Sequence, residues 1–154
     1  MNFVHVPKTG GFSIAEAFGL SAGDHLPASQ CGEGFLFAFV RNPYERLWSG
    51  WNFIERPKTK ESFRDFVLRR GFDGASDIFY PMAYYLDAPV GFIGRYEYFA
   101  QDVRRLASII PQVNPLPHLN KSDAGPWADA YDEETKGIVA DFYELDFVRF
   151  GYGR

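Results

Sequence analysis

The beginning of the chain alternates between an apolar run, a turn and a helical pattern. Phe3–Val6 is a mostly apolar run, and a turn with two glycines follows it at residues 7–11. Beyond the turn, Ser13 and Glu16 have the spacing of a capping box, and Gly19 can end a helix. The apolar face of that helix carries Ile14, Ala17 and Phe18. The pattern therefore predicts a strand, a glycine turn and a helix.

A second strand–turn–helix unit begins at a continuous apolar run. Phe35–Val40 contains no polar residue, which is typical of a central strand covered on both faces. Arg41 and Asn42 end the run, and Pro43 suits the first turn of a helix. Apolar residues then recur at helical spacing, at Tyr44, Leu47, Trp48, Trp51 and Ile54. We predict a buried strand that leads directly into a helix.

The remaining chain continues this alternation. We predict a helix that starts at Ser62, a short helix around Met82–Leu86 and a third strand at Val90–Gly94. A further helix carries Phe99, Val103, Leu106 and Ile110. Asp132 can cap the last predicted helix, whose apolar residues are Ile138, Val139, Phe142 and Tyr143. Alternating strands and helices predict an α/β protein with a parallel sheet.

The composition fits a globular protein and argues against several other classes. The chain has 154 residues, of which 46% are apolar and 23% charged, so it can build a core. A net charge of −4 argues against a general nucleic-acid binder, and the apolar runs are too short to cross a membrane. The first residues lack the pattern of a signal peptide, so we expect a cytoplasmic protein. The single cysteine, Cys31, excludes an internal disulfide and a cysteine-based zinc site.

Charge is distributed unevenly along the chain. Residues 41–70 carry eight basic and four acidic side chains, whereas residues 122–154 carry three basic and eight acidic ones. A basic segment in a mildly acidic protein fits a local anion site. On charge alone, solvated helix surfaces are the simpler interpretation.

The turn after the first strand has the chemistry of an anion site. The first amides of a helix lack partners within it, and the helix dipole adds partial positive charge. Gly10 and Gly11 let the backbone approach a ligand, Lys8 adds a full charge, and hydroxyls come from Thr9 and Ser13. This set fits a phosphate or sulfate group, and the alternative is a tight structural turn. In a Walker loop the lysine follows the glycines, so the order here disfavours an ATPase or kinase.

Two segments resemble the signatures of a known enzyme family. FVHVPKTGGFSI, at residues 3–14, resembles the 5′-phosphosulfate loop of carbohydrate sulfotransferases that use 3′-phosphoadenosine 5′-phosphosulfate (PAPS). The likeness is to the heparan and uronyl 2-O-sulfotransferases and their short bacterial relatives. FAFVRNPYERLWSGWNFI, at residues 37–54, resembles the family's 3′-phosphate segment. Further likeness in IGRYEYFAQDVRRL, LPHLNKS and DFVRFGY extends the resemblance over nearly the whole chain.

The resemblance implies a role for each matching position. Lys8 would contact the oxygen that bridges phosphate and sulfate. The 5′-phosphate would be held by Thr9, Gly10, Gly11, Phe12 and Ser13. The 3′-phosphate would be held by Arg41 and Ser49, and Ser49 lies off the apolar stripe of its predicted helix. The simpler interpretations are helix packing for Ser49 and a salt bridge to Glu45 for Arg41.

Phe12 departs from the family pattern, because most relatives have threonine or serine at this position. Its backbone amide remains, but a hydroxyl that would face the phosphate is lost. One charge-assisted hydrogen bond is worth roughly 1.5–3 kcal/mol, so we expect weaker cofactor binding.

Transfer of a sulfuryl group to an alcohol needs a base that accepts the hydroxyl proton. The resemblance points to His25, which lies between the first helix and the central strand, as this base. His5 lies within the first predicted strand and is expected to be structural, whereas His118 lies in a loop that could line the site. The nucleotide could be covered by Asn120, Lys121 and Ser122.

Together these features predict a PAPS-dependent sulfotransferase with a single domain over residues 1–154. The expected fold is a three-layer, P-loop-like α/β arrangement with a short parallel sheet between helices. The acceptor is expected to be a hydroxyl of a carbohydrate, and no metal and no nucleic acid are expected. The chain is short for this family, so the acceptor cleft would be open or completed by a second subunit. The alternatives are a non-catalytic nucleotide-binding module and a P-loop nucleotide kinase.

Overall fold

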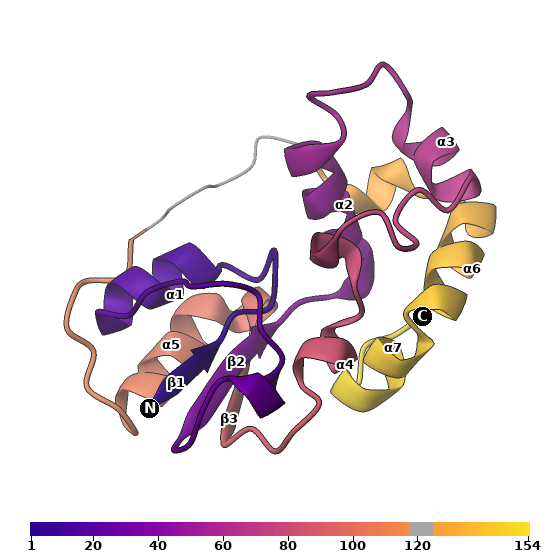
Figure 1. Cartoon of the computed structure of the whole chain (residues 1–154). Coiled ribbons are helices and arrows are strands. Elements are labelled where there is room, and N and C mark those ends of the chain that lie inside the picture. Colours follow the sequence, from indigo (N-terminus) through magenta and orange to yellow (C-terminus); the bar gives the residue numbers. More distant parts are fainter. Residues whose placement is uncertain (118–124) are drawn as a thin grey trace. The chain divides into compact units, whose positions relative to one another are not determined.

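The computed structural model describes residues 1–117 and 125–154, which form two compact units (Figure 1). Unit 1 comprises Met1–Arg41 and Met82–Lys121, and unit 2 comprises Asn42–Pro81 and Ser122–Arg154. Each unit is therefore assembled from two stretches that are distant in sequence. That residues 1–154 make a single domain stays a prediction.

Unit 1 is built on a three-stranded parallel sheet. Its strands are β1 (Asn2–Val4), β2 (Leu36–Val40) and β3 (Phe92–Arg95), in this order across the sheet. In the register, Val4 pairs with Ala38, and Val40 pairs with Arg95. All five residues of β2 are buried, which confirms the predicted central strand. The two outer strands are confirmed with ends that differ from the prediction by one or two residues.

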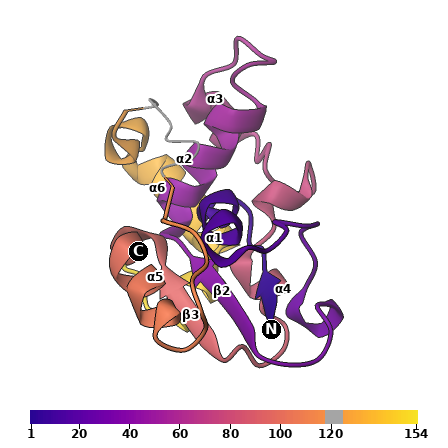
Figure 2. The ribbon, with the colours of Figure 1, turned by 90° about the vertical axis from the view of Figure 1, so that its left-hand side faces the viewer.

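Helices flank this sheet (Figures 1 and 2). α1 (Gly11–Phe18) and α5 (Phe99–Ala107) share a core with one face of the sheet, to which β2 contributes Phe37 and Phe39. The short helix α4 (Met82–Tyr85) precedes β3, and the 3-10 turns η1 (Ala28–Gln30) and η3 (Tyr96–Tyr98) precede β2 and α5. The predicted α/β class, with a short parallel sheet flanked by helices, is confirmed.

The start of α1 differs from the sequence prediction. The helix begins at Gly11, and its N-cap is Gly10 in the left-handed conformation with φ of 85°. Ser13 therefore lies within the first turn, where it is buried, and the predicted capping box of Ser13 and Glu16 is wrong. The physical reason is that glycine reaches a left-handed φ at little cost, so the chain turns into the helix earlier than the capping pattern indicates. Gly19 ends α1 as predicted, with φ of 63°.

Unit 2 is helical in its described part. Its helices are α2 (Pro43–Ile54), α3 (Phe63–Leu68), α6 (Glu133–Phe142) and α7 (Glu144–Phe150), with 3-10 turns η2 (Asp77–Phe79) and η4 (Trp127–Ala130). They enclose a core of mostly aromatic side chains, which includes Tyr44, Trp51, Phe63, Phe66, Phe72, Phe79, Tyr131, Tyr143 and Phe147. The separate helix α7 is not predicted from the sequence, because the apolar pattern of α6 continues into it through Tyr143.

The helix starts of unit 2 follow the sequence signals closely. Asn42 caps α2 through its side chain, and Pro43 occupies the first turn as predicted. Ser62 caps α3, and Asp132 caps α6 in a capping box completed by Thr135. These caps are local, which explains why the sequence reveals them.

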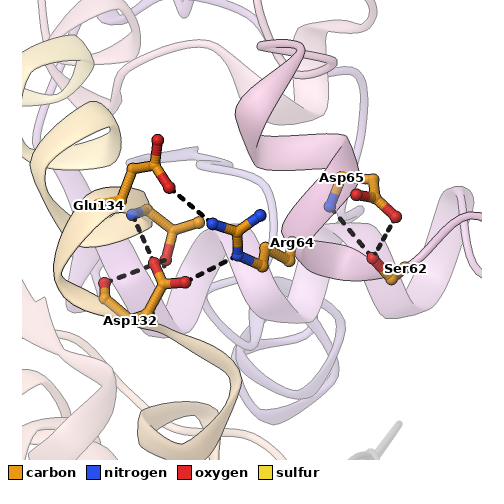
Figure 3. A network of polar contacts seen from close by, with 6 residues as sticks. Ser62, Arg64, Asp65, Asp132 and Glu134 are labelled. Atoms are coloured by element: carbon orange, nitrogen blue, oxygen red, sulfur yellow. Dashed lines mark hydrogen bonds and ion pairs between the residues drawn. The ribbon is translucent and has the colours of Figure 1, made fainter.

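An ion-pair network joins α3 to the start of α6 within unit 2 (Figure 3). Arg64 Nε donates to Asp132 Oδ2 at 2.8 Å, and Arg64 Nη2 donates to Glu134 Oε2 at 2.6 Å. The backbone amide of Thr135 and the Arg64 side chain hold the pKa of Asp132 well below its usual range. A cation of the basic segment is thus neutralised by carboxylates of the acidic segment.

Candidate anion site of unit 1

The carboxyl ends of the three parallel strands bring candidate residues to one edge of the sheet. His5 follows β1, Arg41 follows β2, and Tyr96 follows β3. In parallel α/β sheets, ligands bind outside the carboxyl ends of the strands. The loop at residues 5–10, which connects β1 to α1, lies at this same edge.

The loop is held in a conformation that few residues tolerate. Lys8 has φ of 66° and Gly10 has φ of 85°, so two residues close together are left-handed. Thr9 is fully buried, and its hydroxyl donates to the carbonyl oxygen of Val6 at 2.8 Å. A Cβ at Gly10 would lie 2.7 Å from Cε2 of Phe99. The hydroxyl of Thr9 therefore closes the loop from inside, and a side chain at position 10 would meet the ring of Phe99.

Two cations lie close together at this loop. Arg41 Nη1 donates to the carbonyl oxygen of Lys8 at 3.1 Å, and the Arg41 guanidinium lies 4.0 Å from the ring centroid of Tyr96. Burial, and secondarily the charge of Arg41, lower the pKa of Lys8 to about 8. Burial and the neighbouring guanidinium thus disfavour the charged form of Lys8, and a bound anion would favour it.

The first turn of α1 adds positive potential to the same place. The amides at the start of an α-helix have no acceptor within the helix, and the dipole places partial positive charge there. Within this turn the two side chains differ, because Ser13 is buried whereas Phe12 is 57% exposed. An anion at this helix start would meet its backbone amides, next to the loop that carries Lys8.

Two histidines pack against each other beside this helix start. The rings of His5 and His25 lie 4.6 Å apart in an edge-to-face arrangement, and His5 makes a similar contact with Phe12 at 5.7 Å. A Cβ at Gly11 would overlap Nε2 and Cδ2 of His5, so Gly11 leaves room for this ring. His5 therefore connects His25 to the first turn of α1, a link that the sequence does not reveal.

The environment of His5 fixes its protonation state. His5 is 4% exposed, and its Nδ1 lies 2.9 Å from the carbonyl oxygen of Ala22. Because a carbonyl only accepts, Nδ1 carries the proton and Nε2 is the acceptor nitrogen of the neutral ring. Burial, followed by the charge of His25, lowers the pKa of His5 to about 4. His5 is therefore neutral at pH 7, which fits the structural role expected from the sequence.

Most of the predicted site residues belong to unit 1. The loop, the first turn of α1, His25 and Arg41 all lie in this unit, whereas Ser49 lies on α2 in unit 2. Ser49 is half-buried and off the stripe formed by Tyr44, Leu47 and Trp51, as predicted. His118, Asn120, Lys121 and Ser122 lie outside the described residues. The sequence does not predict that Tyr96 and Phe99 contact the loop, although their position after a strand could have indicated it.

The described residues contain no group of three or more metal-ligating side chains. Within the same ranges, no helix is long and apolar enough to span a bilayer. No protein-family model, curated protein or solved structure matches the chain. The fold and the site by themselves define an α/β protein with a cationic loop at the carboxyl edge of a small parallel sheet. The resemblance to carbohydrate sulfotransferases stays a prediction from the motifs.

Proposed function

We propose that this protein transfers a sulfuryl group from PAPS to a hydroxyl of a carbohydrate, on a P-loop-like fold. The observation that carries the proposal is the pair of cations at the loop between β1 and α1. Arg41 donates to the Lys8 carbonyl, and the pKa of Lys8 is lowered to about 8. Two cations held at a helix start fit a ligand with several negative charges.

The residues of unit 1 fit the phosphate groups of such a donor. The amides of Gly11 and Phe12 begin α1 and would face the 5′-phosphate, with the ammonium of Lys8 beside it. Arg41 has a guanidinium, which can bind phosphate oxygens in a bidentate manner, and would hold the 3′-phosphate. For Ser49, the same role rests on the sequence resemblance alone.

The reaction requires acceptance of a proton and stabilisation of a leaving group. PAPS supplies the sulfuryl group, whose bond to the 5′-phosphate oxygen breaks as the acceptor oxygen bonds to sulfur. His25 accepts the proton of the acceptor hydroxyl as this bond forms. Lys8 neutralises the negative charge that develops on the leaving phosphate oxygen. His5 holds the ring of His25 beside α1 through their edge-to-face contact.

A second candidate function is nucleotide binding without transfer. It is favoured by the inward hydroxyl of Thr9 and by Phe12, which together leave fewer hydroxyls for a phosphate. A P-loop nucleotide kinase is disfavoured by the position of Lys8, which precedes the glycines rather than following them.

Thermal unfolding with different nucleotides tests the proposal. The probes are adenosine 3′,5′-bisphosphate (PAP), ATP with magnesium, and buffer alone. A ligand at 100 times its Kd stabilises the native state by about 2.7 kcal/mol, which moves the unfolding midpoint measurably. We expect stabilisation by PAP and a smaller effect of ATP with magnesium. Preference for ATP would overturn the proposal in favour of a kinase.

Transfer is then measured with labelled PAPS and a panel of carbohydrates. We expect His25→Ala to abolish transfer and to leave PAP binding unchanged, because His25 acts only on the acceptor. An active His25→Ala variant would contradict this assignment. Binding of PAP without transfer to any acceptor would favour the non-catalytic module.

A further inference from the structure

Phe12 occupies an unusual place for an aromatic side chain. It lies in the first turn of α1, is 57% exposed, and packs edge-to-face against His5. The apolar core of this part of unit 1 is formed by other residues of α1, namely Ile14, Ala17 and Phe18. The ring of Phe12 is therefore not needed to fill the core, and more than half of its surface is available to a ligand.

The position of Phe12 relative to His25 limits what such a ligand can be. Both rings contact His5, at centroid distances of 5.7 Å for Phe12 and 4.6 Å for His25. The centroids of Phe12 and His25 are consequently at most about 10 Å apart, the sum of these distances. One small ring stacked on Phe12 at van der Waals distance, about 4 Å, can present a hydroxyl toward His25 within this span.

We propose that Phe12 is the platform on which the acceptor sugar stacks, so that it selects a pyranose ring with an apolar face. This inference rests on the proposed function, and it assigns to Phe12 a role in acceptor binding rather than in cofactor binding. The face of an aromatic ring carries partial negative charge, and the C–H bonds on one face of a pyranose carry partial positive charge. Stacking also removes the exposed apolar surface of Phe12 from water.

A position within about 10 Å of His25, the proposed base, makes the platform selective. A pyranose that lies flat on Phe12 directs its ring hydroxyls sideways, and one of them can then reach His25. An acyclic alcohol has no flat face and would gain little from the ring. Leu26, the residue after His25 in the sequence, is also exposed, at 41%.

Ligand-observed NMR tests this inference without requiring turnover. Saturation transfer from the protein is measured to methyl β-galactopyranoside, to 4-methylphenol and to glycerol, each with and without PAP. The variants are Phe12→Ala, which removes the ring, and Phe12→Tyr, which keeps it. Because Phe12 is exposed at a helix start, Phe12→Ala is expected to fold. Tyr98→Ala is the matched control, because Tyr98 is 58% exposed in the same unit.

We expect saturation of the galactopyranoside C–H protons in the wild type, in Phe12→Tyr and in Tyr98→Ala, and its loss in Phe12→Ala. Equal saturation in Phe12→Ala, or none in a wild type that binds PAP, would overturn the inference. Binding of 4-methylphenol alone would replace the pyranose by an aryl alcohol and overturn the sugar assignment. If the galactopyranoside signal depends on Phe12 but PAP does not bind, the platform stands and the proposed sulfotransferase function fails.

Discussion

Two groups of basic side chains, one in each unit, have different surroundings. In unit 2, Arg64 is paired with Asp132 and Glu134, and Arg69 with Glu61. In unit 1, Lys8 and Arg41 are close enough that the charge of Arg41 lowers the pKa of Lys8. Of the eight basic residues within 41–70, Arg41 belongs to the candidate anion site, whereas Arg64 and Arg69 are paired with carboxylates.

This difference shows how a site is distinguished from a charged surface. Exposed ion pairs such as Arg64–Asp132 contribute little to stability, and their charges are already compensated. Burial and the charge of Arg41 disfavour the charged form of Lys8, and groups with a shifted pKa cluster at functional sites. To locate an anion site, the closeness of basic side chains in the folded loop is therefore more informative than the number of basic residues along a segment.

The largest expected effect comes from the loop of unit 1. Gly10→Ala places a side chain at φ of 85° and 2.7 Å from Phe99. The left-handed conformation costs about 1–2 kcal/mol and overpacking about 1–3 kcal/mol, so we expect a loss of about 2–5 kcal/mol. The control in unit 2 is Gly74→Ala, which has φ of 69° but open space around it. Urea unfolding should show a clearly smaller loss for Gly74→Ala, and equal losses would contradict the close packing at Gly10.

Acid affects the two units in different pH ranges. The pKa of His5 falls from 6.5 to about 4 on folding, so the unfolded state binds more protons between these values and stability decreases as the pH falls through this window. The expected loss is about 3 kcal/mol at pH 4. The pKa of Asp132 in unit 2 is also lowered, so its contribution is lost only below pH 3.8.

Unfolding free energies of the wild type and His5→Asn between pH 7 and 4 measure the contribution of His5. The variant should lose most of the pH dependence in this range, while Asp132→Asn should retain it; the lowered pKa of Glu61 adds a part near pH 4 that both variants keep. A wild-type stability that is constant from pH 6.5 to 4 would contradict the neutral, buried state of His5.

Removal of a loop cation tests whether the charge in unit 1 serves a ligand. We expect Lys8→Ala to weaken PAP binding by roughly 10- to 150-fold, the value of one charge-assisted hydrogen bond. The matched control is Arg64→Ala in unit 2, which removes a paired surface cation and should leave the Kd of PAP unchanged. Isothermal titration calorimetry measures both, and similar effects of the two substitutions would indicate nonspecific attraction of the nucleotide.

The contact between Gly11 and His5 can be tested by rescue. Gly11 has no left-handed φ, so Gly11→Ala is expected to destabilise only by overpacking against His5, by about 1–3 kcal/mol. In a His5→Ala background the same substitution should cost much less, because the ring that it meets is absent. Denaturant unfolding of the four proteins in this double-mutant cycle gives the coupling energy, and additive losses would show that the two residues do not interact.

The smallest expected effect is the pH dependence of ligand binding. Lys8 has a pKa of about 8 in the free protein, and a bound anion would raise it, so binding takes up a proton above pH 8. The affinity for PAP should fall as the pH rises from 8 to 9, by up to about tenfold. Lys8→Arg keeps its charge over this range and should show a flatter profile in the same titrations.

Local patterns account for what could be predicted of the fold. The continuous apolar run at 35–40 identified the buried central strand β2, and Pro43 and Asp132 located two helix starts. The start of α1 was misplaced, because Ser13 and Glu16 have the spacing of a capping box while Gly10 supplies the cap. Gly10 and Ser13 each carry a capping signal, and only the folded backbone shows which of them caps α1.

The sequence by itself determined the order of the three strands and of most helices, α7 excepted, because periodicity, caps and glycine turns are properties of neighbouring residues. Tertiary structure alone decided that His5 meets His25, that Gly11 makes room for His5, and that Arg41 reaches the Lys8 carbonyl. It also decided that Arg64 is neutralised by Asp132. Most of these contacts join residues that are distant along the chain, and all of them depend on where the side chains lie. They form only when the strands align and the helices pack.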